Sequence, residues 1–425
     1  MSYKIAGIDI HKRMVAVVVA DVAGEGEYQF ERHKFGSGGE QLRLLAEWLV
    51  ANQIEEVVME STAQYWKPVW GALERDWQPV SRARGAGAKS GSLLLAQAKS
   101  NRAPRGRKND FADAERLLKR LVANELVLSF VPDTEQRLWR TVSRQKLQLT
   151  RARVRLQNQL EALLEQAHLK LSSLVSDVLG VSARRMLQAL ADGEIDAGRL
   201  AALAHCRLRA TSEQLCDALG AATKLSPVYR RLLQMLLDEL KLQERHMEQL
   251  DQELSVLLTA HHSAIQRLAE VPGLGVDSAQ QILAEVGANA AAFPSAKNLA
   301  SWVGVCPGEE QSAEVSKSAR SPKGNRNLRR LLNQAAHAAV KTKGSVFEWV
   351  FGRLRTRLAY QEAIWAIAHR LCRLIWKILH QGVHYEEHGP AVSIKSKRNR
   401  TTRMIRELRK LGYRVEPVGA FATNM

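Results

Sequence analysis

The chain has 425 residues, enough for two to four domains, and its hydrophobic fraction of 45% is ample for packed cores. Lys and Arg outnumber Asp and Glu by 62 to 44, and a net charge of +18 favours a polyanionic partner over a merely soluble basic protein. The apolar stretch at 14–22 is too short to span a bilayer, so we expect no membrane association. None of the four cysteines has metal-finger or redox spacing, which is typical of a protein of the reducing cytoplasm.

The first part of the chain alternates strand and helix patterns. In chain order, the pattern predicts strands at 3–9, 13–22 and 28–35, a helix at 39–52, a strand at 56–60, a helix at 64–75 and a strand near 78–82. This is the order of the ribonuclease-H-like (RuvC-like) α/β fold, whose central sheet places the carboxylates at strand ends side by side. We therefore assign residues 1–125 to one catalytic domain.

Two acidic residues stand at the ends of predicted strands. Asp9 follows an apolar run, and Glu60 ends the segment VVME. A buried carboxylate without a partner is costly, so each needs a cation. Taken singly, either could be a strand-end residue that faces water.

Two further acidic residues begin a helix predicted at 110–124, after a basic loop at 99–109. Asp110 and Asp113 are three residues apart and therefore share one face of this helix. Helix capping explains one acidic residue there better than it explains two. Together with Asp9 and Glu60 they form a set that could hold two Mg²⁺ ions over a phosphodiester, because hard cations prefer oxygen ligands.

The middle of the chain, residues 126–260, is predicted to be helical with coiled-coil character. Leucine and valine recur every seven residues at Val142, Leu149, Leu156 and Leu163, and a second run follows at Leu233, Leu236, Leu240, Met247, Leu250, Leu254 and Leu257. The two seams can pack on each other or on another subunit. Residues 171–225 between them are Leu- and Ala-rich and are expected to be helical.

Residues 261–385 form a third, helical domain, followed by a basic tail at 386–425. The segment VPGLGVDSAQQIL (271–283) has the turn of a helix-hairpin-helix, in which backbone N–H groups near Gly273 and Gly275 can bind phosphate; a plain packing corner fits it as well. A long polar loop is expected at 306–327. Helices are expected at 328–343 and 358–381.

These segments together resemble the insertion-sequence 110 family of DEDD transposases, the bridge-RNA-guided recombinases, in its subgroup with a longer helical middle. The resemblance covers roughly residues 3–385. It rests on GIDIHK (7–12), VVMESTAQYWKP (57–68), KNDFADAERL (108–117), VPGLGVDSAQQILAEVG (271–287), FPSAKNLASWVGVCPGEEQS (293–312) and GNRNLRRLLNQAA (324–336). It implies that Asp9, Glu60, Asp110 and Asp113 bind Mg²⁺.

The family resemblance also implies a serine nucleophile in the polar loop after the turn Gly304–Pro307. The matching residue is Ser312; Ser316 and Ser318 lie nearby and stay open as alternatives. It further implies a bacterial DNA recombinase that excises and inserts an insertion sequence through a phosphoserine intermediate. A structured non-coding guide RNA would select donor and target DNA. The working form would be a dimer of dimers, with a composite site built from carboxylates of one subunit and the serine of another.

Several basic residues are expected to contact nucleic acid, and His11 beside the carboxylates is placed to contact phosphate. They are Lys12, Arg105, Arg107, Lys108, Arg144, Arg151, Arg155 and Lys323, in addition to the backbone at Gly273 and Gly275. Two other functions stay open: a metal-dependent nuclease or Holliday-junction resolvase that uses water, and an RNA-binding protein without catalytic activity.

Overall fold

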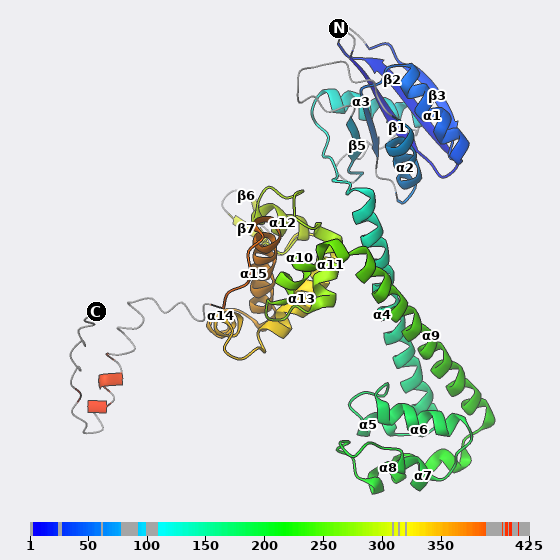
Figure 1. The fold of residues 1–425 in the computed structure, drawn as a ribbon, viewed down its shortest axis with the longest axis vertical. Helices are drawn as coiled ribbons and strands as arrows, with labels where there is room; N and C mark the ends of the chain where they lie inside the picture. The colour runs from blue at the N-terminus through cyan, green and yellow to red at the C-terminus, as the bar shows by residue number, and fades with distance from the viewer. Residues whose placement is uncertain are drawn as a thin grey trace. The chain divides into compact units, whose positions relative to one another are not determined.

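The computed structural model describes residues 3–23, 28–60, 63–77, 92–98, 109–307 and 321–387, the backbone of 310–312 and 315–318, and a few positions between 402 and 415. Contacts divide the chain into two compact units, Met1–Val131 and Pro132–Met425 (Figure 1). The sequence placed the first boundary at 125. The segments 126–260 and 261–385 lie almost wholly in the second unit.

The first unit is built on a mixed five-stranded sheet. Its strands are β1 (Lys4–Ile10), β2 (Met14–Asp21), β3 (Glu31–Gly36), β4 (Glu56–Glu60) and β5 (Ser92–Ala96), in the spatial order β3-β2-β1-β4-β5. β2 runs antiparallel to both β1 and β3, whereas β1, β4 and β5 are parallel. The helices are α1 (Gly39–Ala51), α2 (Trp66–Asp76) and α3 (Asp110–Val122). The predicted RuvC-like order is confirmed. The strand expected near 78–82 lies outside the described residues, and the fifth strand found is β5.

The alternation of side chains along β1 divides the helices between the two faces of the sheet. Ala6, Ile8 and Ile10 enter the core that α1 and α2 cover. Ile5 lies on the opposite face, against Leu118 of α3. Because strand side chains alternate with a period of two, Gly7 and Asp9 share the face of Ile5 and therefore face α3.

Two long antiparallel helices form the middle of the second unit. α4 (Thr134–Gln166) and α9 (Pro227–Leu257) pack along each other, as Figure 1 shows. Of the predicted seam, Leu156 and Leu163 are buried, while Val142 and Leu149 are half-buried. The seams thus pair within one chain, which was one of the two alternatives.

Short helices cap the end of this pair around Leu160 and Leu237. α5 (Leu171–Leu174), α6 (Val181–Ala191), α7 (Ala197–Ala202), α8 (Ser212–Ala218) and the 3-10 turn η1 (Gly220–Lys224) share one core with it. The helical character predicted for 171–225 is confirmed.

The other end of the pair belongs to the C-terminal core. Trp139 of α4 and Leu254 of α9 pack among α10 (His262–Ala269), α11 (Val276–Val286), α12 (Ala296–Val303), α13 (Arg326–Ala339), α14 (Val346–Leu354) and α15 (Tyr360–Gln381), after the turn η2 (Thr259–His261). The loop expectation for 306–327 was incomplete, because a hairpin of β6 (Glu310–Ser312) and β7 (Val315–Ser318) lies within it. Among the described residues, every helix is too short or too polar to cross a bilayer.

A buried carboxylate joins the helical pair to the C-terminal core. Glu285 of α11 is 2% exposed and accepts two hydrogen bonds from Arg144 of α4, at 2.8 and 2.9 Å. It also accepts from Asn325 at 2.8 Å and from Asn327 at 3.0 Å, at the start of α13. A buried charge is tolerated only with such partners, so Glu285 fixes the junction of α4, α11 and α13.

We expect Glu285→Gln to destabilise the second unit by about 1–3 kcal/mol, because the neutral amide loses the charge-assisted hydrogen bonds from Arg144. Urea unfolding, followed by circular dichroism, measures the loss. The matched control is Glu165→Gln, since Glu165 is an exposed residue of α4 whose partner is Lys170. An equal, small effect of both variants would contradict the role given to Glu285.

The same carboxylate makes stability depend on pH. Burial raises the pKa of Glu285, but the hydrogen bonds and charge of Arg144, with Asn325 and Asn327, outweigh burial and hold that pKa below its ordinary 4.5. The stabilisation is therefore present above pH 4.5 and is lost as the pH falls through the lower folded-state pKa. The difference in unfolding free energy between wild type and Glu285→Gln should shrink in that acidic range. A constant difference would contradict this account.

Candidate metal centre

Two of the predicted carboxylates end neighbouring parallel strands. β1 and β4 pair in register, with Gly7 opposite Val58 and Ile8 opposite Met59. Asp9 and Glu60 follow at the same level of the sheet. Val58 packs against Leu117 of α3, and Glu60, two residues on, shares that face. Both carboxylates thus lie on the side of the sheet that α3 covers.

The other two carboxylates come from the first turn of α3. Asn109 caps this helix by accepting a hydrogen bond from the Phe111 N–H at 3.1 Å, which fixes Asp110 as its first residue. Asp110, Asp113, Ala114 and Leu117 recur at helical spacing and face the sheet. The packing of α3 therefore carries both aspartates to the strand ends.

The contact between α3 and β1 depends on a glycine. A Cβ atom built on Gly7 would lie 2.3 Å from the carbonyl oxygen of Ala114 and 3.2 Å from Cβ of Leu118. Only glycine lets the helix backbone approach the strand this closely. Gly7, in the segment GIDIHK, thus sets the distance between Asp9 and the aspartates of α3.

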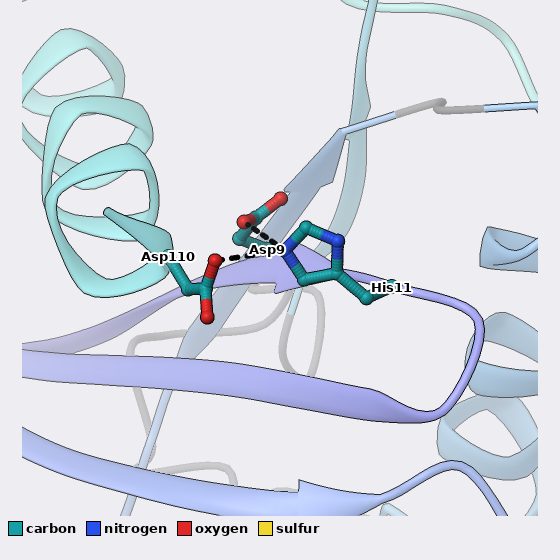
Figure 2. A group of neighbouring side chains, drawn as sticks. All are labelled: Asp9, His11 and Asp110. Atoms are coloured by element: carbon teal, nitrogen blue, oxygen red, sulfur yellow. Dashed lines mark hydrogen bonds and ion pairs between the residues drawn. The ribbon is translucent and has the colours of Figure 1, made fainter. Parts of the chain in front are cut away.

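A histidine bridges two of the carboxylates. Figure 2 shows one nitrogen of the His11 ring facing both Asp9 and Asp110; this Nε2 is 3.1 Å from Asp9 Oδ2 and 3.0 Å from Asp110 Oδ1. One ligand atom of each residue lies within 4.8 Å of the other two. The sequence had marked His11 as a phosphate contact, and the structure places it among the carboxylates.

Two basic residues that the sequence analysis missed complete the cluster. Arg116 donates to Asp113 at 2.6 Å, and its Nη2 lies 3.9 Å from Glu60 Oε2. The ammonium of Lys34 on β3 is 3.7 Å from Asp110 Oδ2. Asp113 and Arg116 are three residues apart on one helix, and this spacing could have predicted their ion pair. No sequence signal connected Lys34 with α3.

The crowding of negative charge shows in the titration of Asp9. Burial is the largest effect and raises the pKa of Asp9; Asp113 and Asp110 raise it further, and His11 opposes them. The ionised form of Asp9 is thus energetically unfavourable unless positive charge is added nearby.

The donor set fits a divalent metal ion. Hard cations prefer the carboxylate oxygens that Asp9 and Asp110 offer, and one ligand atom each of Asp9, His11 and Asp110 lies within 4.8 Å of the other two. The structure brings Asp9 and Asp110 together, whereas Glu60 and Asp113 lie outside that close group and are linked to each other through Arg116. The role of all four carboxylates as ligands stays a prediction.

The other predicted site residues lie elsewhere. Ser312 is the last residue of β6, in the second unit. Arg144 is occupied by Glu285, and Gly273 packs against α13, where an added Cβ would lie 2.3 Å from the Ala335 carbonyl oxygen. Gly275 and the basic side chains of Lys12, Arg151, Arg155 and Lys323 are exposed. Arg105, Arg107 and Lys108 lie outside the described residues.

Two family models match this chain. The model of DEDD transposases of IS110 elements, described as a transposase, covers residues 6–169, and that of the transposase IS116/IS110/IS902 family covers residues 265–349. The first match contains Asp9, Glu60, Asp110 and Asp113. The chain belongs to the IS110 family of transposases. It is therefore a DEDD transposase, an enzyme that binds DNA and whose fold implies a divalent metal.

Among the curated relatives of this IS110 transposase are proteins described as transposases. A probable family 20 transposase of Pseudomonas aeruginosa is 26% identical over 296 residues, which are 66% of this chain and 75% of that protein. The transposase for insertion sequence element IS1328 of Yersinia enterocolitica is 28% identical over 169 residues, 39% of this chain and 50% of its own. A Thermus thermophilus RuvC structure aligns with 14% identity and a TM-score of 0.22, covering 30% of this chain and 99% of RuvC; this score is too low to carry weight.

We expect Gly7→Ala to cost about 1–3 kcal/mol of stability, because the new methyl group forces α3 away from β1. It should also weaken metal binding by moving Asp110 and Asp113. Thermal unfolding and a Mn²⁺ titration measure the two effects. Gly36→Ala is the control, since its Cβ would meet only the flexible side chain of Gln41, at 3.1 Å. Wild-type behaviour of Gly7→Ala would refute the close-packing role.

Asp9→Asn should weaken Mn²⁺ binding by at least about tenfold, because affinity follows the number of charged ligands. Electron paramagnetic resonance of free Mn²⁺ measures this without any need for turnover. Asp76→Asn serves as control, because Asp76 lies at the end of α2, paired with Arg75. DNA cleavage should be lost with metal binding. If Asp9→Asn binds Mn²⁺ and cleaves DNA as the wild type does, the carboxylate cluster takes no part in catalysis.

Proposed function

We propose that this transposase excises and inserts an insertion sequence through a phosphoserine intermediate on Ser312, with Mg²⁺ held by Asp9, Glu60, Asp110 and Asp113. The observation that supports the metal site is the approach of Asp9 and Asp110 at His11, on the face of the sheet that also carries Glu60 and that α3 covers with Asp113. Mg²⁺ there would neutralise the phosphodiester and stabilise the leaving oxygen.

The placement of Ser312 in the backbone supports its choice as nucleophile. Ser312 pairs with Val315 as the last described pair of the β6–β7 ladder, whereas Ser316 pairs with Gln311 and Ser318 with Glu310, farther from the tip. A residue near the tip of a hairpin can reach a bound strand without moving the core that carries the hairpin.

In the proposed reaction, a phosphodiester linkage to Ser312 replaces the DNA phosphodiester and is later exchanged for a new one. The serine hydroxyl loses its proton as its oxygen forms a bond to phosphorus, and the bond from phosphorus to the leaving deoxyribose oxygen breaks. The leaving oxygen takes up a proton. In the second half, a hydroxyl of the partner strand attacks the phosphoserine and releases the serine. No net hydrolysis occurs, so strands are exchanged rather than merely cut.

Assembly into a dimer of dimers is part of the proposal. The pairing of α4 with α9 leaves a second apolar stripe exposed on α9, with residues between 44% and 71% exposed at a spacing of seven or fourteen: Val228, Met235, Leu242 and Val256. Such a stripe favours a further helix from another subunit. We place the carboxylates of one subunit opposite the serine of another in this assembly.

Guidance by a structured non-coding RNA completes the proposal, and the excess of positive charge supports it. Arg151 and Arg155 are exposed on α4, and Lys323 is exposed beside the serine hairpin. Such side chains bind backbone phosphates without reading sequence, so specificity would come from base pairing by the RNA.

Ser312→Ala is expected to abolish covalent protein–DNA adducts and strand joining, because no other group takes the phosphoryl. The assay uses nicked duplexes that tile the end of the insertion sequence, with adducts resolved on denaturing gels in Mg²⁺. Ser316→Ala and Ser318→Ala are the matched controls and should retain adducts. A metal-dependent nuclease that uses water would still cut DNA with the Ser312→Ala substitution. That result would favour the function of a resolvase over that of a recombinase.

A further inference from the structure

The hairpin that carries Ser312 leaves the helical core through a narrow neck. Gly304, at the end of α12, has a left-handed φ of +77°, and a Cβ there would lie 2.6 Å from the Pro322 carbonyl oxygen. A Cβ on Gly324 would lie 2.2 Å from the Val303 carbonyl oxygen. The two sides of the neck thus touch backbone to backbone, which only glycine permits.

One arginine of α13 holds both sides of this neck. Nη1 of Arg329 donates a hydrogen bond to the carbonyl oxygen of Gly304 on one side and to that of Pro322, at 2.6 Å, on the other. Its guanidinium carbon lies 4.7 Å from the ring centroid of Trp365 on α15. The indole N–H of Trp365 donates to Ser321 Oγ at 2.6 Å.

The far end of the neck is fixed as well. Asn325 caps α13 by accepting from the N–H groups of Asn327 and Leu328, and its amide donates to Glu285. Its own backbone N–H donates to the Trp302 carbonyl oxygen at 3.3 Å. The hairpin is therefore attached to α12, α13 and α15 at its base.

We propose that Arg329, seated on Trp365, is a positioning residue that sets where the serine hairpin projects; this rests on the proposed role of Ser312. An isolated two-stranded hairpin is marginally stable in water, so its direction must come from its base. Hydrogen bonds from a charged donor are the strong ones, and the cation–π contact fixes the guanidinium plane. A nucleophile must be held within a fraction of an ångström of its target, so loss of this clamp costs rate.

The experiment compares Arg329→Gln, Arg329→Lys and Arg330→Gln in the full-length protein. Arg330 is the control, because it is the next residue of the same helix and binds Gln281 and Gln334 instead of the neck. Three quantities are measured: the rate of covalent adduct formation on the nicked duplexes, the Kd for the same duplex, and amide hydrogen exchange of residues 310–318.

Arg329→Gln should slow adduct formation by about 30-fold or more, since a misplacement of about 1 Å can cost 100-fold. Exchange in 310–318 should accelerate while exchange in α13 and α15, and the duplex Kd, stay at wild-type values. Arg329→Lys should regain part of the rate, because an ammonium still offers donors over the Trp365 ring. Arg330→Gln should behave as wild type in all three.

Three results would overturn the positioning role. They are wild-type exchange in 310–318 of Arg329→Gln, faster exchange with an unchanged adduct rate, and a general rise in exchange across α13 and α15, which marks a merely stabilising residue. Failure of the proposed function looks different. In that case wild type forms no adduct, or Ser312→Ala keeps it, and the exchange of 310–318 still reports whether Arg329 fixes the neck.

Discussion

The backbone contact between Gly7 and Ala114 is the constraint on which the catalytic unit depends. It brings α3 close enough to β1 for the first turn of that helix to reach the ends of β1 and β4. A side chain of any size at Gly7 would widen this gap and separate Asp110 from Asp9. The site is thus fixed by packing beneath it rather than by contacts among the carboxylates, which repel one another.

That repulsion explains the basic side chains around the cluster. His11, Lys34 and Arg116 each lie within 4 Å of a carboxylate oxygen, from a loop, a strand and a helix respectively. Without positive charge, the burial of Asp9 beside Asp110 and Asp113 would destabilise the fold. The same excess of negative charge favours a divalent ion at this place.

The features that the sequence predicted are those that depend on local sequence patterns. Periodicity and capping locate the strand ends at Asp9 and Glu60, the helix start at Asp110 and the heptads. The order of the strands in the sheet confirmed the predicted fold. Contacts between distant segments were missed: Arg144, expected on nucleic acid, binds Glu285 141 residues later. The β6–β7 hairpin was not predicted, because its two polar strands are short and show no strand pattern of their own. The base of the hairpin is fixed by contacts with α13 and α15.

The shared core at the start of α4 has a consequence for synthesis. Gln136 donates to the carbonyl oxygen of Ala284, 148 residues farther on, and Trp139 packs in the same C-terminal core. At about 5–20 residues per second, the ribosome needs roughly 7–30 seconds to reach Ala284, and longer to complete the core in which Trp139 packs. Throughout that interval Gln136 and Trp139 lack these partners, whereas residues 1–131 have already been synthesised. The catalytic unit can therefore fold during synthesis before the start of α4 finds its place.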